Sequence, residues 1–264
     1  MADGAGVGYI QTVMQRPPQM PSILSTRQAY QWINRIAQKH KQVISLPLSQ
    51  EQVQALNSRI EVDFITSLLA LDEVMVSRKD VLQTSRSAEN IDSPNNSALA
   101  HSLAAYRLLK AVIQSQKQDA NLDVELLLRL HSTTGTGGFR QQRLAGSTVR
   151  PENLPIILDS ACRWFASSAI RELNPVEQAA LAFLRFVEIS PFDHQNERTA
   201  LLAASLFTLR QELPPIIIKP ARKADYDRAL NEGLRMNTQP MVDLVAISIE
   251  QSLDDWLNGA EQLK

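Results

Sequence analysis

ISPFDHQNERTALL, residues 189–202, breaks an otherwise helical part of the sequence with a run of polar residues. Pro191 ends the helical pattern before it, and the apolar run that follows predicts a second helix from about Asn196. Residues 190–197 are therefore expected to form a loop that leads into a helix N-terminus. Free backbone N–H groups and the positive end of the helix dipole make such a terminus a natural binding site for an anion.

Helical periodicity extends through most of the chain on both sides of this loop. Only nine glycines occur in 264 residues, and few segments alternate between apolar and polar residues. Apolar residues instead recur every three or four positions, which is typical of amphipathic helices. We predict an all-α fold with a polar loop at 84–96 and helices that begin at Ser25 and Ser49 and then cover 97–117, 122–131, 155–170, 174–188, 198–212, 224–235 and 240–257.

A glycine-rich stretch, STTGTGGFRQQRLAGSTVRPENLP at 132–155, departs from this pattern. Its turn-forming residues predict a short β-hairpin near 136–150. Gly138, Phe139 and Arg140 would lie in this flap, where an exposed strand could align a partner segment by strand addition. An ordinary hairpin without a partner fits the same residues.

The bulk composition excludes several classes of function. Lys and Arg total 27 against 28 Asp and Glu, so no overall charge recruits nucleic acid or an anionic membrane. No apolar run approaches the roughly 20 residues that cross a bilayer, and the N-terminus lacks the features of a signal peptide. With its single cysteine, Cys162, the sequence predicts a cytoplasmic protein without an internal disulfide.

The domain organisation follows from the proline spacing near the N-terminus. Residues 1–24 contain Pro17, Pro18 and Pro21 and predict an extended arm, while 25–264 predict a single helical domain. Such an arm could lie over a protein partner or a second copy of the chain, so the oligomeric state stays open.

The loop at 190–197 resembles the signature of the Fic (Fido) domain, H-P-F-x-[DE]-G-N-G-R-x-x-R. Pro191, Phe192, Asn196 and Arg198 agree with it. The resemblance extends over about 50–258, because LLLRLHSTTGTGGFRQQRLAG (126–146) is similar to the family's flap and ADYDRALNEGLRMNTQPMVDLVAISI (224–249) to its closing helices. It implies the family's helical fold with a short flap.

The resemblance also implies a chemistry, transfer of AMP from ATP to a protein hydroxyl, for which this chain lacks the usual groups. Ser190 replaces the histidine that acts as the base, and a serine hydroxyl takes up no proton at pH 7. His194 replaces the acidic Mg²⁺ ligand, and imidazole is a poor ligand for magnesium. Gln195 and Glu197 replace two phosphate-binding glycines, and Leu201 replaces the second arginine.

The remaining motif residues keep some capacity to bind an anion. Asn196, Arg198 and Thr199, with Gln195, are the candidate ligand-binding residues. If Glu197 points inward, it would repel a phosphate at about 4 Å by about 4 kcal/mol, or roughly a thousandfold in affinity. Arg198 could equally form a salt bridge with Glu197 or with Asp193.

Many members of the family carry an inhibitory motif, [ST]-x-x-x-E-[GN], whose glutamate pairs with the second arginine. SRSAEN (85–90) matches its letters with Glu89 but lies in the predicted polar loop. LLALDEVMVSRKDV (68–81) matches its position, with Asp72 for the glutamate, and we favour it. Neither acid is expected to find the arginine partner, because position 201 is a leucine.

These departures predict a degenerate Fic protein that binds a ligand or a partner and does not carry out the usual adenylylation. No cofactor and no metal ligand set are expected, with ATP and Mg²⁺ the candidates if family activity persists. The alternative is an enzyme with altered nucleotidyl- or phosphoryl-transfer chemistry, in which His194 or Glu197 supplies the base. A protein partner bound through the flap or the arm is a third reading.

Overall fold

The structure, a computed structural model, describes residues 23–86, 94–134, 137–144, 147 and 149–263 of the chain. Within these residues it contains helices and connecting loops but no strand. The α-helices are α2 (Ile23–Ser45), α3 (Gln50–Ala70), α4 (Arg78–Arg86), α5 (Pro94–Gln116), α6 (Val124–Thr134), α7 (Leu154–Phe165), α8 (Ser168–Arg171), α9 (Pro175–Ile189), α10 (Asn196–Leu209), α11 (Lys223–Leu234) and α12 (Gln239–Glu261). The all-α prediction is confirmed. The predicted arm at 1–24 lies outside the described residues except for Ile23 and Leu24, which are the first two residues of α2, and Glu89 also lies outside them.

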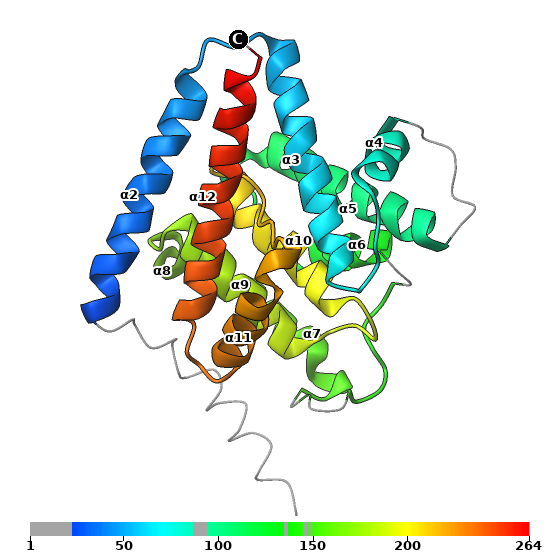
Figure 1. The fold of residues 1–264 in the computed structure, drawn as a ribbon. Helices are drawn as coiled ribbons and strands as arrows, with labels where there is room; N and C mark the ends of the chain where they lie inside the picture. Colours follow the sequence, from blue (N-terminus) through cyan, green and yellow to red (C-terminus); the bar gives the residue numbers. More distant parts are fainter. Residues whose placement is uncertain (1–22, 87–93, 135–136, 145–146, 148, 264) are drawn as a thin grey trace, which may run out of the picture.

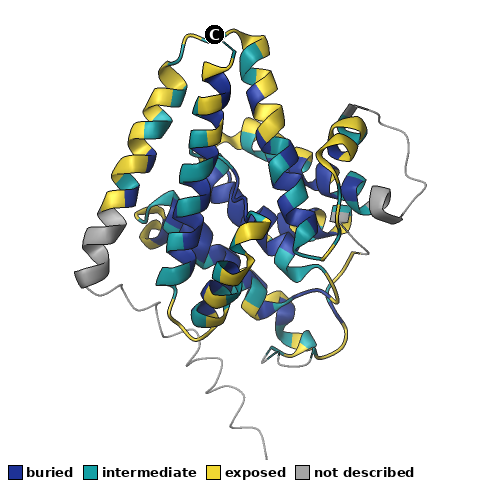
Figure 2. Ribbon diagram, in the orientation of Figure 1, coloured by how far each residue is buried: buried dark blue, intermediate teal, exposed yellow. Residues whose placement is uncertain are grey.

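Helix α10 lies at the centre of the fold, in contact with α9, α5, α6 and α3. Every residue from Arg198 to Thr208 is buried, and Figure 2 shows the ribbon around it in dark blue. The sequence explains this position, because ALLAASLFTL is apolar on all faces and a helix without a polar face has to be covered on all sides. The motif loop therefore feeds directly into the most buried helix of the molecule.

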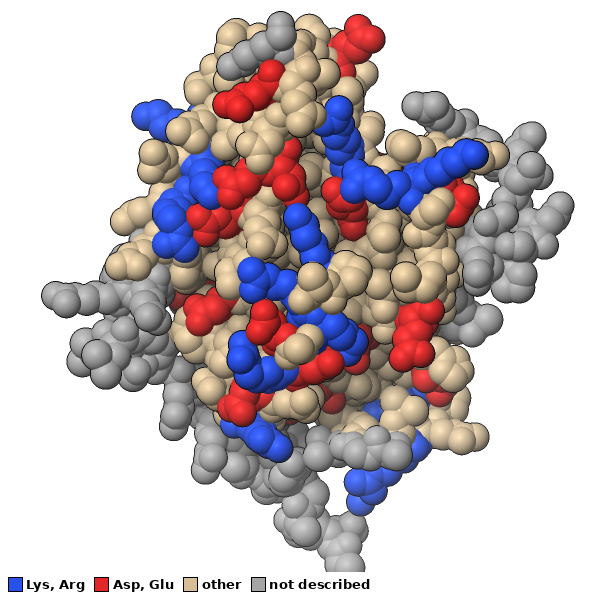
Figure 3. Space-filling view, viewed as in Figure 1, with Lys and Arg blue, Asp and Glu red and all other residues tan. Residues whose placement is uncertain are grey.

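Helices α2, α12 and α3 lie side by side, with α12 between the other two (Figure 1). Helix α2 packs on α12 through two buried residues, Trp32 and Ile36. Charged side chains flank this stripe: Arg35 and Lys39 both bind Glu250, at 2.8 and 3.0 Å. On this face of the molecule, acidic and basic side chains alternate and form no patch of a single sign (Figure 3).

A buried extended segment, residues 216–218, runs between α10 and α11. Its backbone polar groups are satisfied by three serine hydroxyls, because no neighbouring strand supplies partners. The N–H groups of Ile216, Ile217 and Ile218 donate to Ser205 of α10, Ser248 of α12 and Ser67 of α3 at 3.2, 2.7 and 2.8 Å. Three helices are thereby tied to one non-helical stretch of chain.

The predicted β-hairpin near 136–150 is wrong. The described residues of this stretch form turns, and the backbone N–H of Arg140 donates to the carbonyl of Pro191 in the motif loop at 3.0 Å. The Arg140 side chain binds the carbonyls of Gln142 and Val149, at 2.8 and 2.6 Å. The guanidinium group of Arg140 therefore takes up two backbone carbonyls, those of Gln142 and Val149, that could otherwise have paired with a neighbouring strand. Gly146, which also belongs to this glycine-rich stretch, lies outside the described residues.

Candidate functional site

The motif loop joins α9 to α10 through two residues in the left-handed region. Helix α9 begins with a capping box of Asn174 and Glu177 and is followed by its C-cap residue Ser190, which has φ 45° and ψ 64°. Gln195, with φ 59° and ψ 28°, precedes α10. Gln195 stands where the signature has its first glycine, so the loop adopts a backbone conformation that favours glycine although the glycine is gone.

Asn196 closes this loop with its side-chain amide. Its Oδ1 accepts from the N–H of Phe192 at 2.9 Å, and its Nδ2 donates to the carbonyl of the same residue at 2.8 Å. Asn196 is already the first residue of α10, and Gln195 occupies the N-cap position without a side-chain hydrogen bond to the helix. The asparagine thus fixes the shape of the loop, and both ends of its amide are occupied.

Ser190 directs its hydroxyl away from the loop. The Oγ donates to the carbonyl of Val187, one turn back in α9, at 2.5 Å. The carbonyl of Ser190 accepts from Nε of Arg140 at 2.8 Å. The residue at the position of the family's base is therefore held by two structural hydrogen bonds. The hydroxyl hydrogen of Ser190 is thereby engaged with a backbone carbonyl of its own helix.

Phe192 forms an aromatic stack beneath the loop. Its buried ring lies parallel to that of His131, with centroids 3.6 Å apart and planes at 5°. The Nδ1 atom of His131 lies 3.2 Å from the hydroxyl of Thr199. Phe139, partly buried, contacts the other side at 6.2 Å. Thr199, a candidate ligand-binding residue, is 1% exposed and holds this stack in place.

The two residues at the tip of the loop, Asp193 and His194, are exposed. His194 forms no hydrogen bond or ion pair with any other described residue. The structure also finds no group of three His, Cys, Asp or Glu side chains, among the residues it describes, that could hold a metal ion. The loop tip therefore faces solvent.

Glu197 is hydrogen-bonded to a residue that the sequence did not single out. Its Oε2 atom accepts from the hydroxyl of Tyr226, a buried residue of α11. Burial, together with the nearby charge of Glu197, raises the pKa of Tyr226 above its ordinary value. Tyr226 therefore stays protonated as a donor, and Glu197 is directed toward α11. Nothing in the spacing of the sequence marks this pair.

Arg198 is sealed inside the fold by Asp72. The guanidinium is 1% exposed, and its Nη2 forms an ion pair with Oδ2 of Asp72 in the turn after α3. Its Nε and Nη1 atoms are buried and have no hydrogen-bond partner among the described residues. Burial raises the pKa of Asp72 and lowers that of Arg198, and the attraction between the two opposes both shifts. The second motif arginine is absent, because position 201 is a leucine, and Asp72 pairs with the first motif arginine instead.

The flap residues do not form the exposed edge that we expected. Gly138 has φ 109°, which only glycine adopts readily, and leads the chain down to Phe139 and Arg140. Arg140 is fully buried, and its guanidinium donates to the carbonyls of Ser190, Gln142 and Val149 and to the hydroxyl of Ser147, at 3.1 Å for the last. Arg140 therefore fastens the flap to the motif loop, since four of its five guanidinium N–H groups are engaged and its side chain is fully buried.

Comparison with known proteins places these residues in a recognised context. Residues 121–208 match the model of the Fic/DOC family. A protein adenylyltransferase Fic from Drosophila erecta is 28% identical over 165 residues, which is 59% of this chain and 33% of the relative. One from Nematostella vectensis is 33% identical over 107 residues, 40% of this chain and 25% of the relative. The chain thus spans about a third or less of these curated relatives.

Solved structures extend the similarity in fold. A Fic-1 structure (residues 134–508) from C. elegans superposes with a TM-score of 0.81 at 19% identity, covering 91% of this chain and 75% of that one. A Fic domain containing signaling protein from Bacteroides thetaiotaomicron gives 0.75 at 19% identity, covering 88% and 97%. The helices outside residues 121–208 therefore share this architecture as well.

Proposed function

We propose that this chain, whose residues 121–208 match the model of the Fic/DOC family, acts as a binding module without adenylyltransferase activity. The observation that carries the proposal is the hydroxyl of Ser190, which occupies the position of the catalytic histidine and donates to Val187 at 2.5 Å. General base catalysis needs a group whose pKa lies near the working pH and that reaches the attacking hydroxyl. A serine hydroxyl already engaged as a donor meets neither condition.

The phosphate-binding part of the motif supports the same proposal. Asp72 occupies the only motif arginine, Arg198, whose guanidinium is withdrawn from solvent. Glu197 adds a carboxylate at the N-terminus of α10, held by Tyr226. Two carboxylates of the chain itself thus lie at the motif, one on its arginine and one in the first turn of α10, and both disfavour an anionic ligand there. These residues do not fit Mg²⁺-ATP bound in the family's manner, and we derive no chemical step through it.

The alternative of altered chemistry finds less support in the geometry. Glu197, the first candidate base, is engaged by Tyr226, and His194, the second, is exposed at the loop tip. A base needs a fixed position relative to its substrate as well as a suitable pKa. Loss of a measured transfer activity in His194→Ala or Glu197→Ala would restore this reading.

An AMP-transfer assay tests the proposal directly. The full chain is incubated with ATP labelled in the α-phosphate, with Mg²⁺ or Mn²⁺, alone and with a protein lysate as acceptor. We expect no label on any protein, and no stabilisation by ATP in a thermal-shift experiment. An active adenylyltransferase assayed in parallel shows that the conditions support transfer. Label that disappears in Arg198→Ala would overturn the proposal.

A second variant separates the missing base from the occupied anion site. Ser190→His restores the base alone, and we expect it to remain inactive because Asp72 and Glu197 still occupy the site. AMP transfer by Ser190→His would show that ATP binds this loop although Asp72 and Glu197 are present. Inactivity of the native chain would then be explained by the missing histidine alone. Asp72→Asn added to Ser190→His is the next combination to measure.

A further inference from the structure

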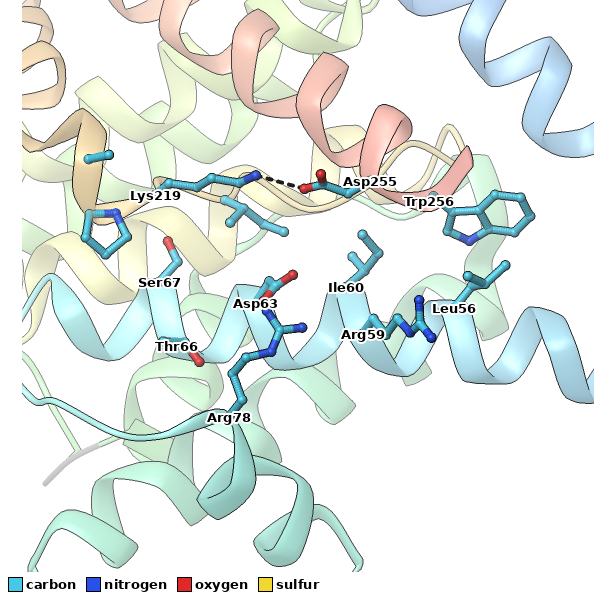
Figure 4. A pocket seen from close by; sticks show the side chains of 13 residues that line it. Leu56, Arg59, Ile60, Asp63, Thr66, Ser67, Arg78, Lys219, Asp255 and Trp256 are labelled. Carbon is cyan, nitrogen blue, oxygen red and sulfur yellow. Dashed lines mark hydrogen bonds and ion pairs between the residues drawn. The ribbon is translucent and has the colours of Figure 1, made fainter. Parts of the chain in front are cut away.

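A cleft of about 510 Å³ lies between α3, α12, the first residue of α4 and residues 217–221. Its volume is in the range of sites that hold small molecules. Figure 4 shows side chains from all four elements turned into it, with α3 along one wall and Lys219 and Asp255 along the other. None of its lining residues belongs to the motif loop.

One end of the cleft offers a preformed apolar surface. Four side chains line it, and each is less than a tenth exposed: Leu56 and Ile60 of α3, Ile217 of the extended segment and Trp256 of α12. The indole Nε1 of Trp256 donates to Oδ1 of Asn57 at 3.3 Å, so the only polar atom of the ring is satisfied outside the cleft. A flat apolar group placed here would meet carbon atoms on the protein side.

The charged residues of the cleft leave one cation without a partner. Arg78 pairs with Asp63 at 2.5 Å, and Lys219 pairs with Asp255 at 2.8 Å. The fifth charged residue, Arg59, forms no ion pair or hydrogen bond with any described residue. Each carboxylate is already matched by a cation, so the net charge of the lining is positive and resides on Arg59.

A glycine in α12, Gly259, leaves room for the guanidinium of Arg59. A β-carbon at Gly259 would lie 3.1 Å from Nη1 of Arg59 and 2.7 Å from Cδ2 of Leu56. A side chain at 259 would therefore push both groups out of position. The absence of a side chain lets the guanidinium lie against α12, one turn from the Trp256 ring.

We propose that this cleft is a binding site for a small organic anion, a carboxylate or phosphate carried on a flat apolar body. The anionic group would bind Arg59, whose planar guanidinium offers paired donors to either kind of oxygen group. The apolar body would lie on the surface formed by Leu56, Ile217 and Trp256. The cleft is independent of the motif loop, so the proposal stands or falls separately from the absence of adenylylation.

A set of four probes of similar size tests the proposal by calorimetry and by tryptophan fluorescence. The probes are 3-phenylpropionate, phenyl phosphate, the neutral 3-phenylpropionamide and the cationic phenethylammonium ion. We expect at least one of the two anions to bind, and the amide and the cation to bind at least roughly tenfold more weakly, because charge-assisted hydrogen bonds to arginine are lost. Which anion binds more tightly distinguishes a carboxylate site from a phosphate site.

Two matched variants locate the site. Arg59→Gln is expected to weaken the anion roughly tenfold or more, while Arg129→Gln, an exposed arginine of α6, leaves the affinity unchanged. Trp256→Phe is expected to abolish the fluorescence change and to retain binding in calorimetry. Equal affinities for anion and amide, equal affinities in the two arginine variants, or no binding by any probe would each overturn the proposal.

Discussion

Arg140 fastens the glycine-rich flap to the motif loop, and its removal should therefore release both. In the native structure its guanidinium makes four hydrogen bonds, three of them to backbone carbonyls of residues 142, 149 and 190. We expect Arg140→Met to destabilise the fold, because a methionine of similar length offers no donor to any of these acceptors.

The magnitude follows from two opposing contributions. Four hydrogen bonds to a charged group at about 1.5 kcal/mol each contribute about 6 kcal/mol. Burial of the guanidinium, which also lowers the pKa of Arg140, offsets several kcal/mol of that gain. The expected net loss is about 3 kcal/mol. For a chain of this length, with an unfolding entropy of about 2 cal/mol/K per residue, the midpoint temperature falls by about 5 °C.

Calorimetry and limited proteolysis measure the two consequences. Arg143→Met is the matched control, because Arg143 lies in the same flap but is exposed and makes one long hydrogen bond, 3.3 Å to the carbonyl of Ser147. It should shift the midpoint by less than about 1 °C, since surface substitutions rarely exceed about 0.5 kcal/mol. New cleavage within 137–149 is expected in Arg140→Met only. Identical melting and cleavage in the two variants would refute the reasoning.

Two substitutions and one chemical reaction test other parts of the molecule. Tyr226→Phe should lower the free energy of unfolding at pH 7 by about 2 kcal/mol, because Glu197 loses its donor. The raised pKa of Tyr226 lets the native state keep a proton that the unfolded chain loses above pH about 10. The stability of the wild-type protein should therefore fall more steeply above that pH than the stability of the variant. Parallel urea midpoints from pH 7 to 10.5 would contradict this. Asn196→Ala should lose both hydrogen bonds to Phe192, a cost of about 2 kcal/mol, and hydrogen exchange at 192–196 should accelerate; unchanged exchange would count against the loop closure. Because burial raises the pKa of Cys162 to about 12, this thiol should react with a disulfide reagent at pH 8 only as urea unfolds the chain, and rapid reaction of the native protein would show an open site.

The helices were predictable because each depends on a local pattern. The capping box at 174–177 and the apolar run of α10 are read directly from neighbouring residues. Helix α4 was missed because Arg78–Arg86 is short and polar, so its periodicity is weak. The flap was predicted as a hairpin because glycine-rich turns indicate a change of direction, whereas the conformation depends on Arg140, whose acceptors include a residue 50 positions away.

The candidate site was predictable in position but not in its contacts. The resemblance located residues 190–198 and Asp72, and the structure brings Asp72 to Arg198. The partner of Glu197 was not foreseen, since Tyr226 lies 29 residues further along and is an ordinary core position by pattern. Side-chain partners across helices depend on tertiary packing, which the spacing of residues within one helix does not record.

The serines that hold residues 216–218 have a consequence for how this chain acquires its structure. Their hydrogen bonds join positions separated by 11, 31 and 151 residues, and the last of these closes a loop of more than half the chain. Such a closure becomes favourable only after α3, α10 and α12 have assembled, so the extended segment should be sealed late in folding. A truncated protein limited to residues 121–208 would lack the segment and two of its three serines. The stretch that carries the family signature is therefore not an autonomous folding unit, and protein made for any experiment on the motif has to include the helices on either side of it.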